Sequence, residues 1–364
     1  MRYALILAGG SGTRLWPLSR QTLPKQLIPF VDGKSLLEIA YDRLEQLVPP
    51  ERRFVCAGET HRNAIAGQLT NLSDNQFLGE PTGRDTLSAL AFSAAVIARE
   101  DKDAVIAVFT ADHIIEPVDE FLRTVRDGFS VVEQTNATLM TFGITPTRAA
   151  TGYGYLELGE PFEGHARVVR KFREKPDAET AERYLQAGAE KYLWNSGMFI
   201  WKAEFFLDCV RRYEPEVYSG VMNIAKSWGS SAAGSVIAEE YPKLKKISVD
   251  FAVMEKASAD PDVTVAAVPM RASWLDVGSW PAYGEILEKD AAGNAVSGCV
   301  SCFVDSGGSI AVSDNPDHLI AAIGCNDLVI IHSKDATLIC PREKAEKIKD
   351  LHAKISKEFG GKFV

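Results

Sequence analysis

The first half of the chain alternates between short apolar runs and segments in which apolar residues recur at helical spacing. The apolar runs cover residues 4–7, 53–57, 104–109 and 138–142. Between them, residues 36–44 and 88–96 repeat apolar side chains every three or four positions, as amphipathic helices do. Strands that alternate with such helices predict an α/β fold with a parallel, doubly wound sheet.

Beyond residue 287 the pattern changes to short β-rich runs separated by Gly, Asn and Asp. These runs cover residues 293–304, 309–312, 319–323, 328–331 and 337–339, and a helix with several lysines is expected over residues 342–357. We interpret this region as a few coils of a β-solenoid capped by a helix. The sequence therefore predicts a catalytic domain over residues 1–287 and a small β-rich domain over residues 288–364.

The composition narrows the class of protein. The 364-residue chain has 46% hydrophobic and 24% charged residues, and its net charge of −9 argues against nucleic acid or a membrane surface as a partner. No signal peptide or membrane-spanning run is visible and the six cysteines are scattered, so we expect a reduced, cytoplasmic protein. The pair Cys299 and Cys302 predicts no metal site, because residues three apart on a strand face opposite sides and no second pair accompanies them.

A glycine-rich loop directly after the first strand is the strongest chemical signal in the chain. Gly9, Gly10 and Gly12 leave backbone N–H groups open to an anion, and Arg14 and Lys25 follow with positive charge. The spacing matches neither a Walker P-loop nor a dinucleotide-binding fingerprint. The alternative is a tight strand-to-helix turn with incidental basic neighbours. We interpret the loop as a cradle for a chain of phosphates.

Two aspartates are candidates for binding a divalent cation. Asp112 follows the apolar run 104–109, so it is expected at the carboxyl end of a strand, on the same edge of the sheet as the glycine loop. A carboxylate there suits Mg²⁺, although it could equally be a helix N-cap. Asp276 is either a turn residue or a second ligand of the cation, and spacing does not decide between them. His113 is expected to be a structural hydrogen-bonding residue.

The middle of the chain carries residues that suit a sugar phosphate. Segments 152–155 and 194–199 combine aromatic, glycine and amide residues, which can pack on sugar rings and pair with hydroxyls. Lys175 precedes Pro176, so its backbone is expected to be extended; its side chain is either a clamp for a monophosphate or a solvated surface group. Glu80 offers a carboxylate that can accept both the N1–H and the exocyclic amine of guanine, a donor pair that adenine lacks.

Together these residues resemble the mannose-1-phosphate guanylyltransferases of the sugar nucleotidyltransferase superfamily, over nearly the whole chain. Eight motifs occur in the family's order, at residues 7–20, 24–26, 80–84, 111–113, 172–176, 194–199, 250–256 and 274–280. The loop version Trp16-Pro17-Leu18-Ser19 is typical of the guanylyl, mannose-specific branch. The resemblance implies a Rossmann-like, doubly wound mixed sheet with a small C-terminal left-handed β-helix. It also implies that GTP and α-D-mannose 1-phosphate react to give GDP-mannose and pyrophosphate.

The resemblance further implies a role for each site residue. Catalysis would depend on Arg14, Lys25, Asp112 and Asp276, and the two aspartates would hold Mg²⁺. The nucleotide would be bound by Leu7, Ala8, Gly9, Gly10, Gly12, Thr13, Arg14, Lys25, Glu80, Pro81, Arg84 and Asp112. The sugar phosphate would be bound by Tyr153, Gly154, Glu174, Lys175, Asn195 and Gly197. A homodimer through the C-terminal β domain is expected by analogy with the family.

The chain departs from the family pattern in ways that leave alternatives open. Asp85-Thr86-Leu87-Ser88 stands where many relatives have Asn-Thr-Ala-Pro, so the detail of the base pocket is not settled by the resemblance. The isomerase domain of the long bacterial forms does not follow before Val364, and isomerase activity is not expected. The alternatives are a nucleotidyltransferase for another hexose 1-phosphate or NTP and a non-catalytic nucleotide-sugar binding protein. A β-solenoid acyltransferase is disfavoured because the β region is too short.

Overall fold

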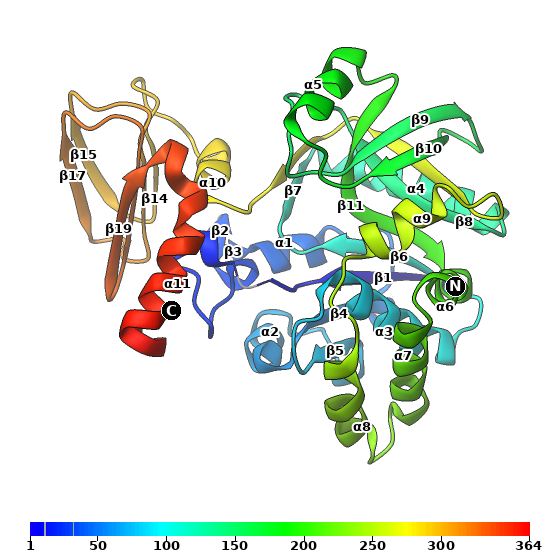
Figure 1. Cartoon of the computed structure of the whole chain (residues 1–364). Coiled ribbons are helices and arrows are strands. Elements are labelled where there is room, and N and C mark those ends of the chain that lie inside the picture. The colour runs from blue at the N-terminus through cyan, green and yellow to red at the C-terminus, as the bar shows by residue number, and fades with distance from the viewer. Residues whose placement is uncertain (11, 32) are drawn as a thin grey trace. The chain divides into compact units, whose positions relative to one another are not determined.

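The chain folds into two compact units (Figure 1). The computed structural model describes residues 1–10, 12–31 and 33–364, so Ser11 of the glycine loop lies outside the described residues. The first unit comprises residues 1–9, 40–111 and 115–274, and the second comprises residues 10–39, 112–114 and 275–364. The boundary predicted between residues 287 and 288 follows the change in sequence pattern rather than this grouping of contacts, and it stays a prediction.

The first unit is built on a mixed sheet that has nine strands within the described residues (Figure 1). In order across the sheet these are β5 (Phe77–Glu80), β4 (Arg53–Gly58), β1 (Arg2–Leu7), β6 (Val105–Thr110), β11 (Tyr192–Lys202), β8 (Thr138–Ile144), β12 (Thr264–Met270), β10 (Arg167–Arg173) and β9 (Tyr155–Pro161). All four strands predicted for the first half of the chain are therefore confirmed, with ends that differ by one or two residues.

The strands of this sheet do not all run in one direction. β1 pairs in parallel with both β4 and β6, as the alternating pattern predicts. β11, however, runs antiparallel to β6 and to β8, and β10 runs antiparallel to its neighbours. Because β11 is apolar on both faces, its sequence carries no signal for direction. The four strands predicted from the alternating pattern, β1, β4, β6 and β8, therefore share one direction, while β10 and β11 run against them. The mixed sheet implied by the family resemblance is confirmed.

Helices cover the sheet of the first unit with their apolar sides. α4 (Val118–Gln134) buries Phe121, Val125, Phe129 and Val132, which recur at helical spacing, against β11 and β12. α3 (Asp85–Glu100) is buried along most of its length because small alanine and serine residues let α6 (Ala203–Tyr213) and α7 (Pro215–Ser227) approach it closely. The remaining helices are α2 (Arg62–Gln68), α5 (Ala178–Ala187), α8 (Ala233–Glu240) and α9 (Glu255–Ala257).

The second unit contains the coiled β region. β14 (Ala295–Ser297), β16 (Ile310–Ser313) and β18 (Leu328–Ser333) pair in parallel, as do β15 (Val300–Val304) and β17 (Leu319–Ile323). Parallel pairing between every second strand is what solenoid coils produce, so the predicted β-rich region is confirmed. β19 (Ala336–Pro341) pairs antiparallel with β18 and ends the sheet formed by β14, β16 and β18. The expected terminal helix is α11 (Ile348–Phe359), preceded by a 3₁₀ turn over residues 342–347.

Segments from both ends of the chain share the core of the second unit. Trp16, Phe30, Trp280 and Tyr283 are buried together with the inner residues of β16 and β18. The Trp280 indole donates to the backbone oxygen of Trp16 at 3.1 Å, and the Tyr283 hydroxyl donates to that of Phe30 at 2.8 Å. These buried groups are hydrogen-bonded, so they fix the segment around the glycine loop against the coils.

The remaining short elements connect the larger ones. They are β2 (Pro29–Val31), β3 (Lys34–Ser35), α1 (Leu36–Asp42), β7 (His113–Glu116), β13 (Ser273–Asp276) and α10 (Trp280–Ile286), with β7 paired to β13. Within the ranges that the structure describes, no helix combines the length and the apolarity that crossing a membrane requires.

Candidate functional site

The glycine loop begins where the parallel strands end. The Ala111 backbone N–H donates to Leu7 at 3.0 Å, and Ala8 donates to Cys56 at 2.8 Å, so β1 and β6 reach the same edge of the sheet, as predicted. Gly10 has a φ of 100° with open space where a Cβ would stand. The loop then enters a 3₁₀ turn over Thr13–Leu15 rather than an α-helix.

Gly12 is required by its contacts as well as by its backbone. Its φ is 59°, in the left-handed region, and a Cβ there would lie 2.7 Å from the Cβ of Lys25 and 2.8 Å from the Ser19 hydroxyl. The absence of a side chain therefore lets Lys25 pack directly against the loop. Lys25 itself begins a second 3₁₀ turn, Lys25–Leu27, and is mostly buried.

Lys25 is held by two aspartates that are distant in sequence. Its Nζ lies 2.6 Å from Asp112 Oδ2 and 4.0 Å from Asp276 Oδ1. Asp112 lies between β6 and β7, and its backbone oxygen accepts from Val277 N at 3.0 Å. The helix N-cap alternative for Asp112 is therefore wrong. Asp276 is the last residue of β13 and not part of a turn, so the interpretation of Asp276 as a turn residue is wrong as well.

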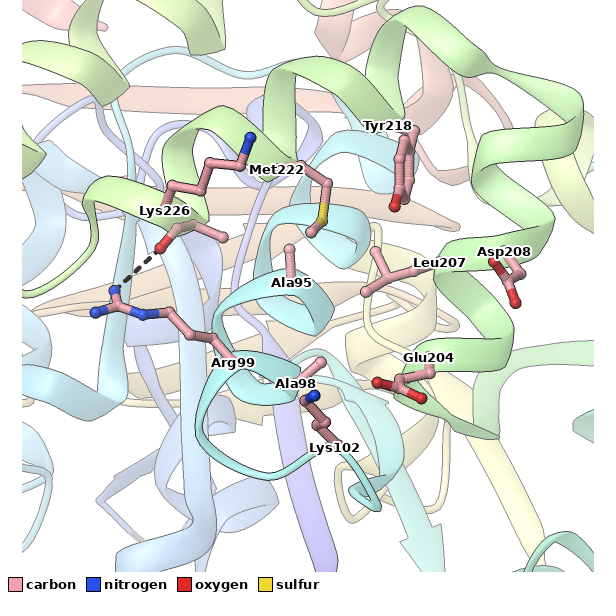
Figure 2. A pocket seen from close by; sticks show the side chains of 11 residues that line it. Ala95, Ala98, Arg99, Lys102, Glu204, Leu207, Asp208, Tyr218, Met222 and Lys226 are labelled. Carbon is pink, nitrogen blue, oxygen red and sulfur yellow. Dashed lines mark hydrogen bonds between the residues drawn. The ribbon is translucent and has the colours of Figure 1, made fainter.

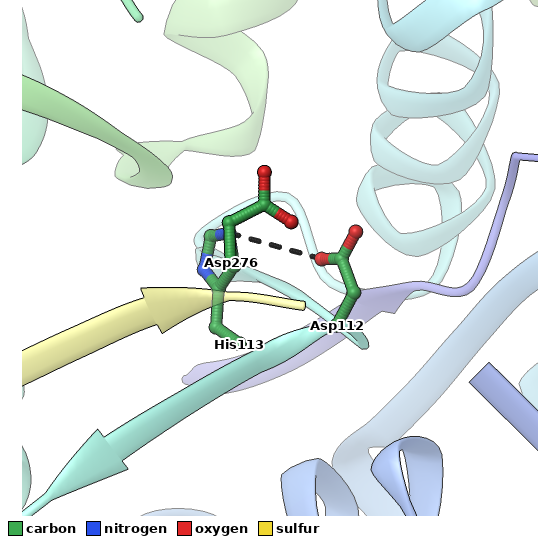
Figure 3. A group of neighbouring side chains, drawn as sticks. All are labelled: Asp112, His113 and Asp276. Carbon is green, nitrogen blue, oxygen red and sulfur yellow. Dashed lines mark ion pairs between the residues drawn. The ribbon is translucent and has the colours of Figure 1, made fainter. Parts of the chain in front are cut away.

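Asp112, His113 and Asp276 form a compact group of possible metal ligands (Figure 3). Each offers one ligand atom, and these atoms lie within 4.8 Å of one another; no other such group occurs among the described residues. The His113 Nε2 lies 3.7 Å from Asp112 Oδ1, beyond hydrogen-bond length, and the His113 side chain is buried. Since Mg²⁺ prefers oxygen ligands, the two carboxylates are the better candidates of the three.

The electrostatics of the pair fit a cation. Burial raises the pKa of Asp276, the neighbouring Asp112 carboxylate raises it further, and Lys25 lowers it in part. For Asp112, burial acts upward, but the Lys25 ammonium and then His113 hold its pKa well below its ordinary value. Asp276 Oδ1 is buried and, over the described ranges, accepts no hydrogen bond. A buried carboxylate oxygen without a donor, beside a second carboxylate, is what a divalent cation would satisfy.

The other cation of the loop, Arg14, faces a different partner. Its Nε lies 2.8 Å from Glu346 Oε2, in a pair in which both side chains are well exposed. Such an exposed pair contributes little stability, so the Arg14 guanidinium can leave Glu346 to bind an anion at small cost. Thr13, the first residue of the 3₁₀ turn, is partly buried.

Glu80 is a partly buried residue of the first unit. It ends β5, and its Oε1 accepts a hydrogen bond of 2.6 Å from the Tyr241 hydroxyl, while a Cβ on Gly9 would lie 3.9 Å from its Oε2. Burial raises the pKa of Glu80, and the Tyr241 hydrogen bond lowers it in part. Tyr241 was missed by sequence reasoning, because nothing in its own segment marks it and 161 residues separate it from Glu80.

The neighbours of Glu80 are placed differently. Pro81 is exposed. Arg84 donates through Nη2 to the backbone oxygen of Pro242, and its Nε is buried with no acceptor in the described part of the chain. Arg84 therefore anchors the loop after β5 while keeping one unsatisfied donor.

Three of the residues predicted to bind the sugar phosphate lie close together, and the others are placed separately. Gly154, Glu174 and Asn195 are close together: a Cβ on Gly154 would lie 2.6 Å from Glu174 Oε2 and 3.3 Å from the Cβ of Asn195. Asn195 N also donates to Gly154 at 2.8 Å. Tyr153 instead packs its ring edge-to-face on Trp194, at a centroid distance of 5.1 Å. Gly197 has a φ of 71°, a left-handed conformation that favours glycine.

Lys175 corrects a prediction about its backbone. Its φ is 44°, so the extended conformation expected before Pro176 is wrong. Tertiary contacts hold this segment, since the preceding N–H, on Glu174, donates to Glu255 Oε1 at 2.8 Å. The Lys175 side chain is 57% exposed, and its Nζ lies 3.0 Å from Glu174 Oε1. It is thus neither free in solvent nor buried.

Two further features lie apart from these residues. All six cysteines are free in the structure, and the reduced state expected from the sequence stays a prediction. An open pocket of about 620 Å³ lies between α3, α6 and α7 (Figure 2). Cationic side chains of Arg99, Lys102 and Lys226 and acidic ones of Glu204 and Asp208 line it, and its lining includes no predicted site residue.

Comparison with known proteins assigns the chain to a family. Residues 3–293 match the nucleotidyl transferase family, and residues 301–354 match a MannoseP isomerase/GMP-like β-helix domain. A mannose-1-phosphate guanylyltransferase from Klebsiella pneumoniae is 37% identical over 365 residues, which cover 96% of this chain and 73% of that protein. The chain belongs to the mannose-1-phosphate guanylyltransferase family of nucleotidyl transferases.

Other members of this guanylyltransferase family agree with the assignment. The Escherichia coli mannose-1-phosphate guanylyltransferase is 34% identical over 359 residues, covering 95% of this chain and 74% of its own length. A solved structure described as a mannose-1-phosphate geranyltransferase from Thermus thermophilus superposes with a TM-score of 0.85 at 30% identity, covering 98% of this chain and 99% of that one. The mixed nucleotidyltransferase sheet and the β-helix region expected from the sequence are thereby confirmed, and the chain is that of a transferase.

Proposed function

We propose that the protein transfers GMP from GTP to α-D-mannose 1-phosphate and releases pyrophosphate. The observation that carries the proposal is the meeting of Asp112 and Asp276 with Lys25 beside a glycine loop. Paired carboxylates for a cation, together with a loop of open N–H groups, are the equipment of phosphoryl transfer. Relatives named for this reaction share about 35% identity with the chain over most of its length.

The nucleotide would be bound in two parts. Leu7 and Ala8 would lie at the start of the triphosphate site, and the glycines up to Gly12 would present backbone N–H groups to it. The Thr13 hydroxyl would donate to a phosphate oxygen, and Arg14 and Lys25 would neutralise the negative charge. Glu80 would accept the two guanine donors, supported by the Tyr241 hydroxyl that orients its carboxylate. Pro81 and Arg84 would shape the loop around the base.

The cation would be held by Asp112 and Asp276. Bound there, Mg²⁺ would neutralise and align the phosphate oxygens of the nucleotide. Lys25 would then exchange part of its pairing with Asp112 for the triphosphate, since its Nζ has three N–H donors and, among the described residues, donates to one side-chain oxygen.

The sugar phosphate would be bound by Glu174, Asn195, Lys175, Tyr153, Gly154 and Gly197. One of its phosphate oxygens would attack the α-phosphorus in line, and the bond from that phosphorus to the bridging oxygen would break as pyrophosphate leaves. The attacking oxygen is already anionic, so the residues need to position and neutralise rather than abstract a proton.

A panel of pyrophosphate-release assays tests the proposal. Four NTPs are combined with mannose, glucose, galactose and N-acetylglucosamine 1-phosphates, with Mg²⁺ present. The proposal expects the GTP and mannose 1-phosphate pair to be turned over fastest. Faster turnover of another pair would identify the alternative transferase, and no turnover of any pair would favour a nucleotide-sugar binding protein. The domain boundary at residue 287, the homodimer and the cytoplasmic location stay predictions.

A further inference from the structure

The turn that follows residue 249 adopts an unusual helical form. Asp250–Met254 is a π-helical turn, which continues into α9 at Glu255. Single π-turns widen the backbone and are found frequently at functional positions. Three residues of this turn, Ala252, Val253 and Met254, are buried, so packing fixes its position in the first unit.

Asp250 of the turn and Glu255, the first residue of α9, reach residues assigned above to the sugar phosphate. Asp250 Oδ1 accepts from Asn195 Nδ2 at 3.0 Å, and Glu255 Oε1 accepts from the Glu174 backbone N–H at 2.8 Å. A third contact, from Phe172 N to the Ser258 hydroxyl at 3.2 Å, ties the end of β10 to the same segment. The turn and the residues of and just after α9 therefore contact β11, which carries Asn195, and the end of β10, which precedes Glu174.

The amide of Asn195 is oriented from both of its ends. The Thr141 hydroxyl has one proton, which it shares between Asn195 Oδ1 at 2.8 Å and the backbone oxygen of Met198 at 3.0 Å. On the other side of the amide, Asp250 Oδ1 accepts from Asn195 Nδ2 at 3.0 Å. Thr141 is fully buried and Asn195 nearly so. In its ionised form Asp250 can only accept from the amide nitrogen, so the ionised carboxylate favours one of the two amide orientations.

The charged residues that act on Asp250 include Glu174 and Lys175, which were assigned above to the sugar phosphate. Burial raises its pKa to about 7, with the Glu174 carboxylate as the next contribution, while Lys175 lowers it. The pKa of Lys175 is raised by Glu174, Asp250 and Asp85 against the effect of burial. Asp250 is therefore a member of the charged group around Lys175, and not a surface acid that happens to meet Asn195.

We propose that Asp250 is a positioning residue for the sugar phosphate, which acts by orienting the Asn195 amide toward the sugar hydroxyls. The proposal rests on the proposed function, in which Asn195 binds the sugar. One Nδ2 hydrogen and one Oδ1 lone pair of Asn195 are not used by Thr141 and Asp250, so a hydroxyl can still pair with the oriented amide.

The test is a double-mutant cycle between Asp250 and Asn195. Asp250→Ala is expected to raise the KM for mannose 1-phosphate about tenfold, as loss of one oriented hydrogen bond does, with little change in the KM for GTP. Asp250→Asn keeps an acceptor oxygen and is expected to restore a KM within about threefold of the wild type. In the Asn195→Ala background, Asp250→Ala should add nothing, because its effect passes through the missing amide.

Additive effects in the cycle, an equal rise in both KM values, or an unchanged KM in Asp250→Ala would each overturn the proposal. Phe251→Ala is the matched control, since Phe251 lies on the same turn with its ring exposed and is expected to leave both KM values unchanged. Melting curves check the fold of every variant; if Asp250→Ala does not fold, Asp250→Glu, which displaces the carboxylate by one methylene, replaces it. If the wild type prefers another sugar phosphate, the cycle is measured with that substrate, which separates a failure of the proposed function from a failure of this inference.

Discussion

Removal of the Lys25 charge should destabilise the protein in a way that a divalent cation reverses. In a Lys25→Met variant, the side chain keeps nearly its length and its packing against Gly12 but loses its contacts with Asp112 and Asp276. The two carboxylates would then face each other without a counter-charge. A cation supplied from solution would take over part of the role of Lys25.

The size of the effect follows from burial and from the pKa of Asp112. Breaking a fully buried ion pair costs about 3–5 kcal/mol of stability. The side chains of Lys25 and Asp112 are 12% and 24% exposed, so we expect the loss of this pair to cost less, about 2 kcal/mol. Although burial acts upward, Lys25 and His113 lower the pKa of Asp112 from 3.8 to about 2. At about 1.4 kcal/mol per pKa unit, this net lowering corresponds to roughly 2–3 kcal/mol, which is of the same order and includes the opposing effect of burial and the contribution of His113.

The sign of this contribution determines the conditions of the assay. The folded pKa of Asp112 lies below the unfolded one, so the stabilisation is fully present above pH 3.8 and is lost as the pH falls toward about 2. Urea unfolding is therefore measured at pH 7, in EDTA and in about 10 mM MgCl₂, for which the added stability follows from mass action.

The expected result has two parts. In EDTA, Lys25→Met should be about 2 kcal/mol less stable than the wild type; in MgCl₂ most of this difference should disappear. Lys344→Met is the control, since this exposed lysine has no ion pair in the described part of the second unit and should behave as the wild type. A Lys25→Met variant with wild-type stability in EDTA would refute the reasoning, and so would an equal gain from Mg²⁺ in both proteins.

Two further substitutions test the proposed substrate contacts. Lys175→Ala should raise the KM for mannose 1-phosphate about tenfold and the KM for GTP far less, because a charge-assisted contact to the sugar phosphate is lost; steady-state kinetics with each substrate varied would show an equal rise in both if the assigned role is wrong. Glu80→Gln should reduce the preference for GTP over ATP by about tenfold, since the amide can no longer accept both guanine donors; a ratio of kcat/KM equal to that of the wild type would contradict its role in base recognition.

The parts of the fold that sequence reasoning predicted are those with a local signal. The strands over residues 4–7 and 104–109 are apolar runs bounded by polar residues, and the structure has them as β1 and β6. The coils beyond residue 293 are marked by glycine and aspartate at each bend, and the structure has them as parallel pairs. The direction of β11 has no such signal, because a strand buried on both faces has the same pattern in either direction.

The candidate site divides along the same line. Asp112 and the glycine loop were predicted to lie on one edge of the sheet because both follow parallel strands, and hydrogen bonds at the ends of β1 and β6 confirm it. Tyr241 and Thr141 carry no local mark of function, and only tertiary contacts bring them to Glu80 and Asn195. The left-handed backbone of Lys175 has no local signal either, since the local preference of a residue before proline is for an extended conformation.

The central claim is that Asp112 helps to hold the cation on which GMP transfer depends. The most direct measurement is pyrophosphate release from GTP and mannose 1-phosphate over a Mg²⁺ titration, for the wild type and for Asp112→Asn, with melting curves of both. The account predicts Mg²⁺-dependent release by the wild type, matched by GDP-mannose formed in equal amount, and a loss of at least about a hundredfold in the folded variant. Release by Asp112→Asn at the wild-type rate and with the same Mg²⁺ dependence would contradict it.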